Sequence, residues 1–125
     1  RLLLTILTIL SIGAVASATA QTLTVNGADV HVREGALLTI NGDVEHKDGE
    51  MRVYDAARVA ISGNARLVRG SWHLLDDAFM IIRGDLIIEL DAVCWRYRPG
   101  SLDVEGGITN RGELTNEGEI SIGRP

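Results

Sequence analysis

The chain has 125 residues, of which 12 are basic and 17 acidic, and its formal net charge is −5 at pH 7. An acidic surface repels phosphate polymers and anionic lipid headgroups, so we expect no nucleic acid partner. The single cysteine, Cys94, excludes an internal disulfide, and the length suits one small domain.

The first twenty residues have the pattern of a secretory signal peptide. A basic first residue precedes an apolar run that ends at Ala16, and Ala18 and Ala20 stand at the A-x-A spacing of a cleavage site. The run is shorter than the roughly 20 residues that a helix needs to cross a bilayer. We therefore expect a cleaved signal peptide at 1–20 and an exported domain at 21–125, located outside the cell or on its outer surface, with no stable membrane span after cleavage.

From residue 35 the sequence repeats with a period of 21. Segments 35–55, 56–76 and 77–97 align without a gap, and a shared glycine follows a shared isoleucine by two residues. Six positions of the repeat, the isoleucine among them, are apolar in all three copies. The aligned sets are Ala36, Ala57 and Ala78; Leu38, Val59 and Met80; Ile40, Ile61 and Ile82; Gly42, Gly63 and Gly84; Val44, Ala65 and Leu86; Met51, Trp72 and Val93; Val53, Leu74 and Trp95.

Apolar and mostly polar positions alternate within each copy, which is typical of a strand with one buried face. A single short strand has nothing to cover that face, whereas stacked copies bury it in continuous columns. The sequence therefore predicts an all-β fold, a parallel β-helix (β-solenoid) of about four rungs, each rung being one 21-residue turn. The crossover rule for parallel strands favours a right-handed winding. Gly42, Gly63 and Gly84 are expected at corners that need positive φ or close approach of the backbone.

Both ends depart from the period. Leu23, Val25 and Gly27 repeat the motif too close to Gly42, which predicts an abbreviated first rung that caps the solenoid. Near the other end the motif comes one residue late, and we expect the insertion at Pro99 and Gly100. A six-residue beat follows, "TNRGEL" and then "TNEGEI". The sequence starts without Met and stops in mid-repeat, so we expect a domain truncated at its C-terminal end, with further rungs or domains of the same parent chain as its partners.

Segment 72–82 allows a second interpretation. Trp72, Leu75, Phe79 and Ile82 would line one side of a helix. The unbroken register on both sides and the β-branched pair Ile81–Ile82 favour a strand instead.

The segments "GALLTINGDV" and "TNRGELTNEGEISI", together with the leader that ends before Gln21, resemble the N-terminal β-solenoid repeat regions of secreted and cell-surface proteins of Bacteroidetes-type bacteria. Many of those proteins use type IX secretion through a C-terminal signal, which is not visible in this sequence. The resemblance implies a structural or adhesive module, and it carries over no catalytic residues.

One column combines residue types that could carry chemistry. If the period holds, Arg52, His73 and Cys94 all point outward, and the imidazole would lie one strand spacing from the thiol. Such a pair could favour a thiolate nucleophile, but no third orienting group can be named. We therefore favour a chance neighbourhood on the surface.

Two acidic columns could bind a cation or cleave a sugar chain. Asp43, Asn64 and Asp85 follow the corner glycines as an oxygen-rich ladder that calcium could bridge, although such residues more often bond turn backbone. Asp55 and Asp76 share a column, and Asp77 and Asp91 lie nearby. Two carboxylates close together could act as the general acid and base of a glycosidase. The prediction for both sets is solvated or turn-bonded carboxylates, with no metal and no cofactor.

Aromatic residues are few. Trp72 and Trp95 fall in predicted inward columns, whereas Tyr54 and Tyr97 could offer an outer surface to sugar rings. The histidines show no metal-ligand spacing; they are His31, His46 and His73.

These observations predict a non-enzymatic structural or adhesive β-solenoid module of an exported bacterial surface protein, with surface polysaccharide as the expected ligand class. The alternative is the first rungs of a β-helical polysaccharide lyase or glycoside hydrolase whose catalytic part lies downstream.

Overall fold

The computed structural model describes residues 3–6, 10–12, 17–20, 22–96, 100–116 and 119–123, and the described part is all-β, with two sheets of parallel strands. The sheet with eight strands follows the order β1-β4-β6-β8-β10-β12, with β2 also on β4 and β13 also on β10. Its strands are β1 (Leu3–Ile6), β2 (Leu10–Ile12), β4 (Thr22–Val32), β6 (Val44–Val53), β8 (Ala65–Leu74), β10 (Leu86–Arg96), β12 (Ile108–Asn110) and β13 (Glu113–Asn116). The other sheet follows the order β14-β11-β9-β7-β5-β3, from β3 (Ser17–Ala20), β5 (Leu37–Ile40), β7 (Arg58–Ile61), β9 (Phe79–Ile82), β11 (Ser101–Val104) and β14 (Glu119–Ile122).

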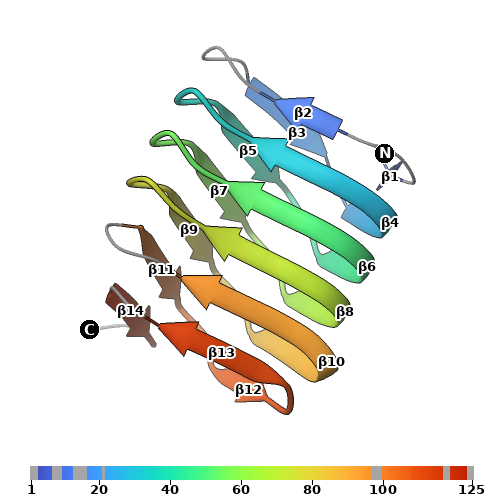
Figure 1. Cartoon of the computed structure of the whole chain (residues 1–125), viewed down its shortest axis with the longest axis vertical. Helices are drawn as coiled ribbons and strands as arrows, with labels where there is room; N and C mark the ends of the chain where they lie inside the picture. Colours follow the sequence, from blue (N-terminus) through green and yellow to red (C-terminus); the bar gives the residue numbers. More distant parts are fainter. Residues whose placement is uncertain are drawn as a thin grey trace.

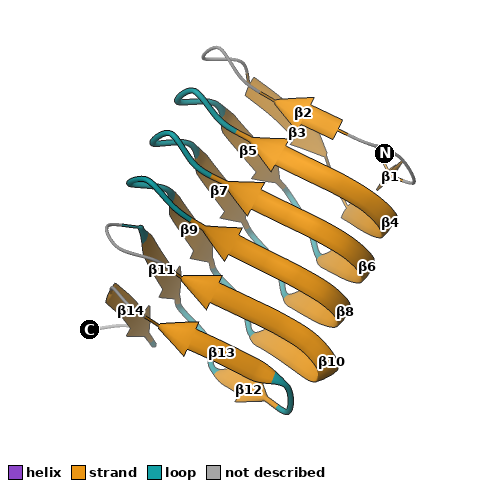
Figure 2. Cartoon of the chain, viewed as in Figure 1, coloured by secondary structure: helices purple, strands orange, loops and turns teal. Residues whose placement is uncertain are grey.

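The strands wind as a β-solenoid. In Figure 1 the long strands β4, β6, β8 and β10 cross the front toward the left, and the short strands β5, β7, β9 and β11 return behind them. The chain descends by one strand with each rung, which makes the winding right-handed. Loops join the two sheets along both sides of the stack (Figure 2). The predicted parallel β-solenoid of about four rungs is confirmed, and segment 72–82 contains strand and turn with no helix.

The core is built from columns of inward side chains with the predicted period. Ile40 is paired with Ile61, and Ile61 with Ile82, so the three stack directly over one another. All three are at most 1% exposed, and the column continues to Val104. The inward side chains of one rung are covered by those of the neighbouring rung, and the backbones of the two rungs are hydrogen-bonded to each other. Stacking therefore buries apolar surface and pairs backbone groups at the same time.

The long strands β4, β6 and β8 bend near the middle, where each has a glycine of positive φ: Gly27, Gly49 and Gly70. Gly49 and Gly70 have φ values of 105° and 95°, and a Cβ on Gly70 would lie 2.1 Å from the Gly49 carbonyl oxygen. The bend lets one strand cover two sides of the core, and only glycine fits where the two backbones approach so closely.

A tight turn joins β4 to β5, β6 to β7 and β8 to β9. The two central residues of each turn have positive φ, as in Asp55 (55°) and Ala56 (60°), and the Ala57 N–H donates to the Tyr54 carbonyl at 3.2 Å. The turns stack as well, since the Ala56 N–H donates to Asp76 O on the next rung. Positive φ at both central positions favours Gly, Asn and Asp, which makes Ala56 the unusual residue of this turn.

The first rung differs from the prediction. Leu23 is paired with Val44 and Val25 with His46, so this rung has the full 21 residues and is not abbreviated. Gly27 lies inside β4, whereas Gly42 lies at the corner between β5 and β6, so the two glycines are not equivalent. The described parts of residues 1–20 form β1, β2 and β3, which pair with β4 and β5 as a further rung. This pairing does not test cleavage after Ala20, which stays a prediction.

The extra residue before the last rungs also lies elsewhere than predicted. A β-bulge in β10 places Glu89 and Leu90 opposite one residue of β8, because Ile88 is paired with Leu67 and Asp91 with Arg69. From there the offset is 22 residues, and it is still 22 where Leu102 pairs with Met80. No net insertion is therefore needed at Pro99 and Gly100; Pro99 itself lies outside the described residues.

The bulge changes which side chains of β10 point inward. Cys94 replaces the predicted Val93 beneath Trp72, and Trp95 moves to the outer face. Cys94 is 0% exposed and Trp95 36% exposed. The rung between β11 and β14 is shorter. Leu102 is paired with Ile120, which lies 18 residues later, and this interval corresponds to a rung with three sides of six residues each.

Candidate functional site

The long strands carry one outer row of side chains suited to binding. His31, Arg52, His73 and Trp95 are successive Cα partners on four rungs, and we call this row the outer strip. The sequence predicted Arg52 and His73 there, but it predicted Cys94 in the place that Trp95 occupies. The predicted pair of His73 and Cys94 is wrong, because the two side chains lie on opposite faces of the sheet.

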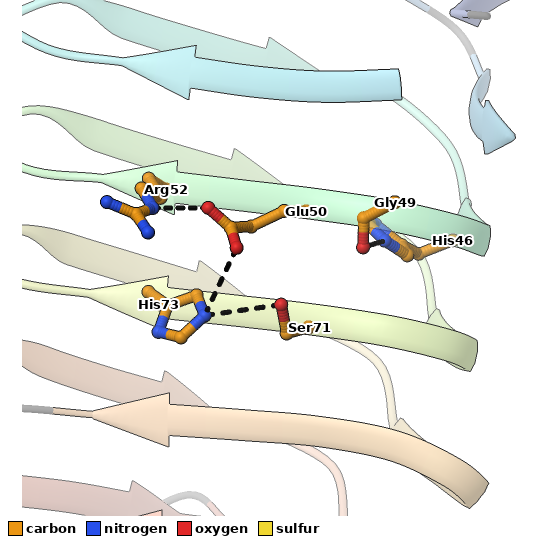
Figure 3. Close-up of polar contacts among 6 residues, drawn as sticks. All are labelled: His46, Gly49, Glu50, Arg52, Ser71 and His73. Atoms are coloured by element: carbon orange, nitrogen blue, oxygen red, sulfur yellow. Dashed lines mark hydrogen bonds and ion pairs between the residues drawn. The ribbon is translucent and has the colours of Figure 1, made fainter. Parts of the chain in front are cut away.

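Beside the strip, Glu50 and Ser71 complete a polar cluster (Figure 3). Arg52 Nε donates to Glu50 Oε1, and the Glu50 carboxylate lies 3.8 Å from His73 Nε2. The Ser71 hydroxyl lies 3.2 Å from the same Nε2. A serine nucleophile would need its acid on the other ring nitrogen, so this cluster lacks the geometry of a proton relay.

The pKa of His73 lies below its ordinary value. Burial is the largest cause, Glu50 raises the pKa in opposition, and Arg52 lowers it further. The neutral ring stands edge-on to Trp95, with ring centroids 5.4 Å apart. The strip is therefore a packed surface of planar rings and hydrogen-bonding groups.

A hollow opens where the outer strip meets the turns. It has a volume of about 350 Å³ and is lined by His31, Arg52, Tyr54, Leu75 and Asp76. The His31 ring meets Tyr54 at 88° with centroids 6.1 Å apart. The sequence placed Tyr54 on the outer surface, and the hollow contains it; Tyr97 lies outside the described residues.

The predicted oxygen ladder is present and bonded to backbone. Asp43 Oδ1 accepts the Asn64 N–H at 2.8 Å, Asn64 Oδ1 accepts the Asp85 N–H at 2.8 Å, and Asp85 Oδ1 accepts the Gly107 N–H at 2.8 Å. Each side chain thus bonds to the rung that follows it. Gly63, Gly84 and Gly106 are needed because a Cβ would lie 2.2 to 2.3 Å from these oxygens.

The other predicted acidic group is only partly brought together. Asp55 and Asp76 lie in stacked turns, and Asp77 is adjacent. Asp91 is paired with Arg69 near the middle of the long strand, away from those turns. Within the described ranges, no group of three or more His, Cys, Asp or Glu side chains is placed to hold a metal ion.

Sequence reasoning missed a polar pair in the core. His46 is 0% exposed, accepts the Trp72 Nε1–H at Nδ1 (2.9 Å) and donates from Nε2 to Gly49 O (2.9 Å; Figure 3 shows the second contact). Alternation alone places position 46 inward, but the partner lies 26 residues away in the sequence. Both ring nitrogens are used, so this histidine has a structural role.

No family model matches the chain, and neither the curated proteins nor the solved structures contain a significant match. Within the part of the chain that the structure describes, no helix is long and apolar enough to cross a membrane.

Proposed function

We propose that the chain is a non-enzymatic structural or adhesive β-solenoid module of an exported bacterial surface protein. The observation that carries the structural part is the continuous ladder from rung to rung. Strands, corners and turns all donate backbone hydrogen bonds to the neighbouring rung, as in Gly63 N–H to Gly42 O (2.8 Å) and Gly84 N–H to Gly63 O (2.9 Å). Bonds at the corners resist bending between rungs, which suits a stiff spacer.

Export is supported by the leader pattern of residues 1–20. The test joins these residues to a reporter enzyme that is active only outside the cytoplasm. We expect activity outside the cell, loss of activity when Ile6→Arg interrupts the apolar run, and a mature N-terminus at Gln21 by mass spectrometry. A reporter that stays inside, or an intact leader on the exported chain, would contradict this part.

The spacer role is tested by changing the number of rungs. Duplication of residues 56–76 adds one complete period and keeps every column in register. We expect a folded protein whose largest dimension grows by roughly 4.8 Å per added rung in small-angle scattering. Duplication of residues 56–65 alone is the control, and it should disrupt the fold because it breaks the register. A whole-rung duplication that unfolds the chain or leaves its length unchanged would overturn the proposal.

A further inference from the structure

We propose that the hollow formed by His31, Arg52, Tyr54, Leu75 and Asp76 binds one ring of a neutral saccharide. This inference deepens the adhesive part of the proposed function and rests on it. The hollow lies at the carboxyl ends of β4, β6 and β8, so three successive rungs contribute to it. Its volume of about 350 Å³ falls in the range of small-ligand sites.

The aromatic side of the hollow is held in place. The edge contact with His31 supports the Tyr54 ring, and the Tyr54 N–H donates to Val32 O at 3.0 Å. A fixed phenol ring offers an apolar face for the C–H groups of a pyranose and a hydroxyl for one hydrogen bond. Leu75 adds a half-buried apolar wall.

The polar side supplies planar donors and acceptors. Arg52 bonds to Glu50 through Nε, and Figure 3 shows the rest of its guanidinium pointing toward the end of β6. Asp76 presents an exposed carboxylate on the neighbouring rung. A guanidinium donates and a carboxylate accepts two parallel hydrogen bonds, which is what two adjacent sugar hydroxyls require.

Charge decides between a neutral and an acidic sugar. The Arg52 charge is already paired with Glu50, while Asp76 lies in the hollow and Asp55 and Asp77 occupy the neighbouring turn positions. With a net charge of −5, the chain repels a uronate or sulfate group. The ring that fits is therefore uncharged.

The test is a titration of the full chain with cellohexaose, maltohexaose and mannohexaose, with hexagalacturonate as the acidic comparison. The readout is the NMR shift of the Tyr54 ring and the Arg52 side chain. We expect at least one neutral hexamer to shift both signals and to bind at least tenfold more tightly than hexagalacturonate.

Arg52→Gln and Tyr54→Leu should each weaken that binding at least fivefold. Arg83→Gln is the matched control, because Arg83 is similarly exposed and also pairs with a glutamate, Glu105, but lies outside the hollow. Circular dichroism checks that each variant is folded. If one of the two hollow variants is unfolded, the binding measured for the other variant decides. Absence of shifts with all three neutral hexamers, preference for hexagalacturonate, or equal weakening by Arg83→Gln would overturn the inference. Failed export or failed rung duplication would overturn the proposed function and leave this titration unchanged.

Discussion

The Trp72 indole donates a hydrogen bond to the buried His46 imidazole of the preceding rung, with a nitrogen to nitrogen distance of 2.9 Å. This contact requires a neutral His46, since Nδ1 must accept a proton. Burial lowers the pKa of His46, against smaller raising effects of the Gly49 carbonyl and Asp48. A buried polar pair of this kind ties the register of two rungs together inside an otherwise apolar core.

The stability of the fold should depend on pH through His46. Because the folded pKa of His46 lies below its unfolded value, the unfolded chain binds protons more readily, and the free energy of unfolding falls as pH drops through roughly 6.5 toward the lower folded pKa. Denaturant unfolding between pH 8 and 5 measures it. The double variant His46→Leu with Trp72→Phe should lose most of this dependence, whereas His73→Asn should keep most of it. A free energy of unfolding that rises as the pH falls from 7 to 5.5 would contradict the account.

The adjacent glycines Gly106 and Gly107 should tolerate a side chain very differently. A Cβ on Gly106 would lie 2.3 Å from Asp85 Oδ1 and 2.5 Å from Gly84 O, whereas one on Gly107 would meet its nearest atom at 4.0 Å. Gly106→Ala should therefore cost about 2 to 4 kcal/mol of stability, because backbone must move. Gly107→Ala should stay within about 0.5 kcal/mol. Thermal and urea unfolding of the two variants measure the loss of stability. Equal losses for the two variants would show that the backbone at Gly106 is less tightly packed than described.

Ala56 gives a prediction of opposite sign. Its φ of 60° is unfavourable for a residue with a Cβ, at about 1 kcal/mol or more. Ala56→Gly removes that strain and should raise the free energy of unfolding by about 0.5 to 1 kcal/mol, after the entropy that glycine adds to the unfolded chain. Ala60→Gly, in a strand without positive φ, should lower it. A destabilised Ala56→Gly variant would mean that the turn has another conformation.

The bulge in β10 predicts opposite environments for the two tryptophans. Trp72 is 1% exposed and Trp95 36% exposed. Acrylamide should therefore quench the fluorescence of the Trp72→Phe variant strongly and that of the Trp95→Phe variant weakly. Cys94, at 0% exposure, should react with a thiol reagent only after unfolding. Fast labelling of Cys94 in the native protein would show that Cys94 lies on the outer face, as it would if β10 had no bulge.

The period predicted the solenoid because the constraint repeats. Ile40, Ile61 and Ile82 occupy equivalent places, so three copies report the same corner and the same buried face. One inserted residue has no such redundancy. Leu86, Ile88 and Leu90 alternate as if all three pointed inward, yet the bulge leaves Leu90 77% exposed.

The candidate site was less predictable for the same reason. Arg52 and His73 lie before the bulge, so the period placed them correctly, whereas Trp95 and Cys94 lie after it and were exchanged. The hollow joins residues of three rungs, and the turn geometry that brings Asp76 beside Tyr54 leaves no periodic signal. The contact of His46 with Trp72 likewise depends on packing across rungs.

Methyl NMR of the three stacked isoleucines tests the central claim most directly. With labelled isoleucine methyl groups, the account predicts strong cross-peaks between Ile40 and Ile61 and between Ile61 and Ile82, neighbours at roughly 4.8 Å strand spacing. Between Ile40 and Ile82, two rungs apart, it predicts a weak or absent cross-peak. Missing cross-peaks between adjacent rungs, or an Ile40 to Ile82 cross-peak as strong as the other two, would contradict the stacked solenoid.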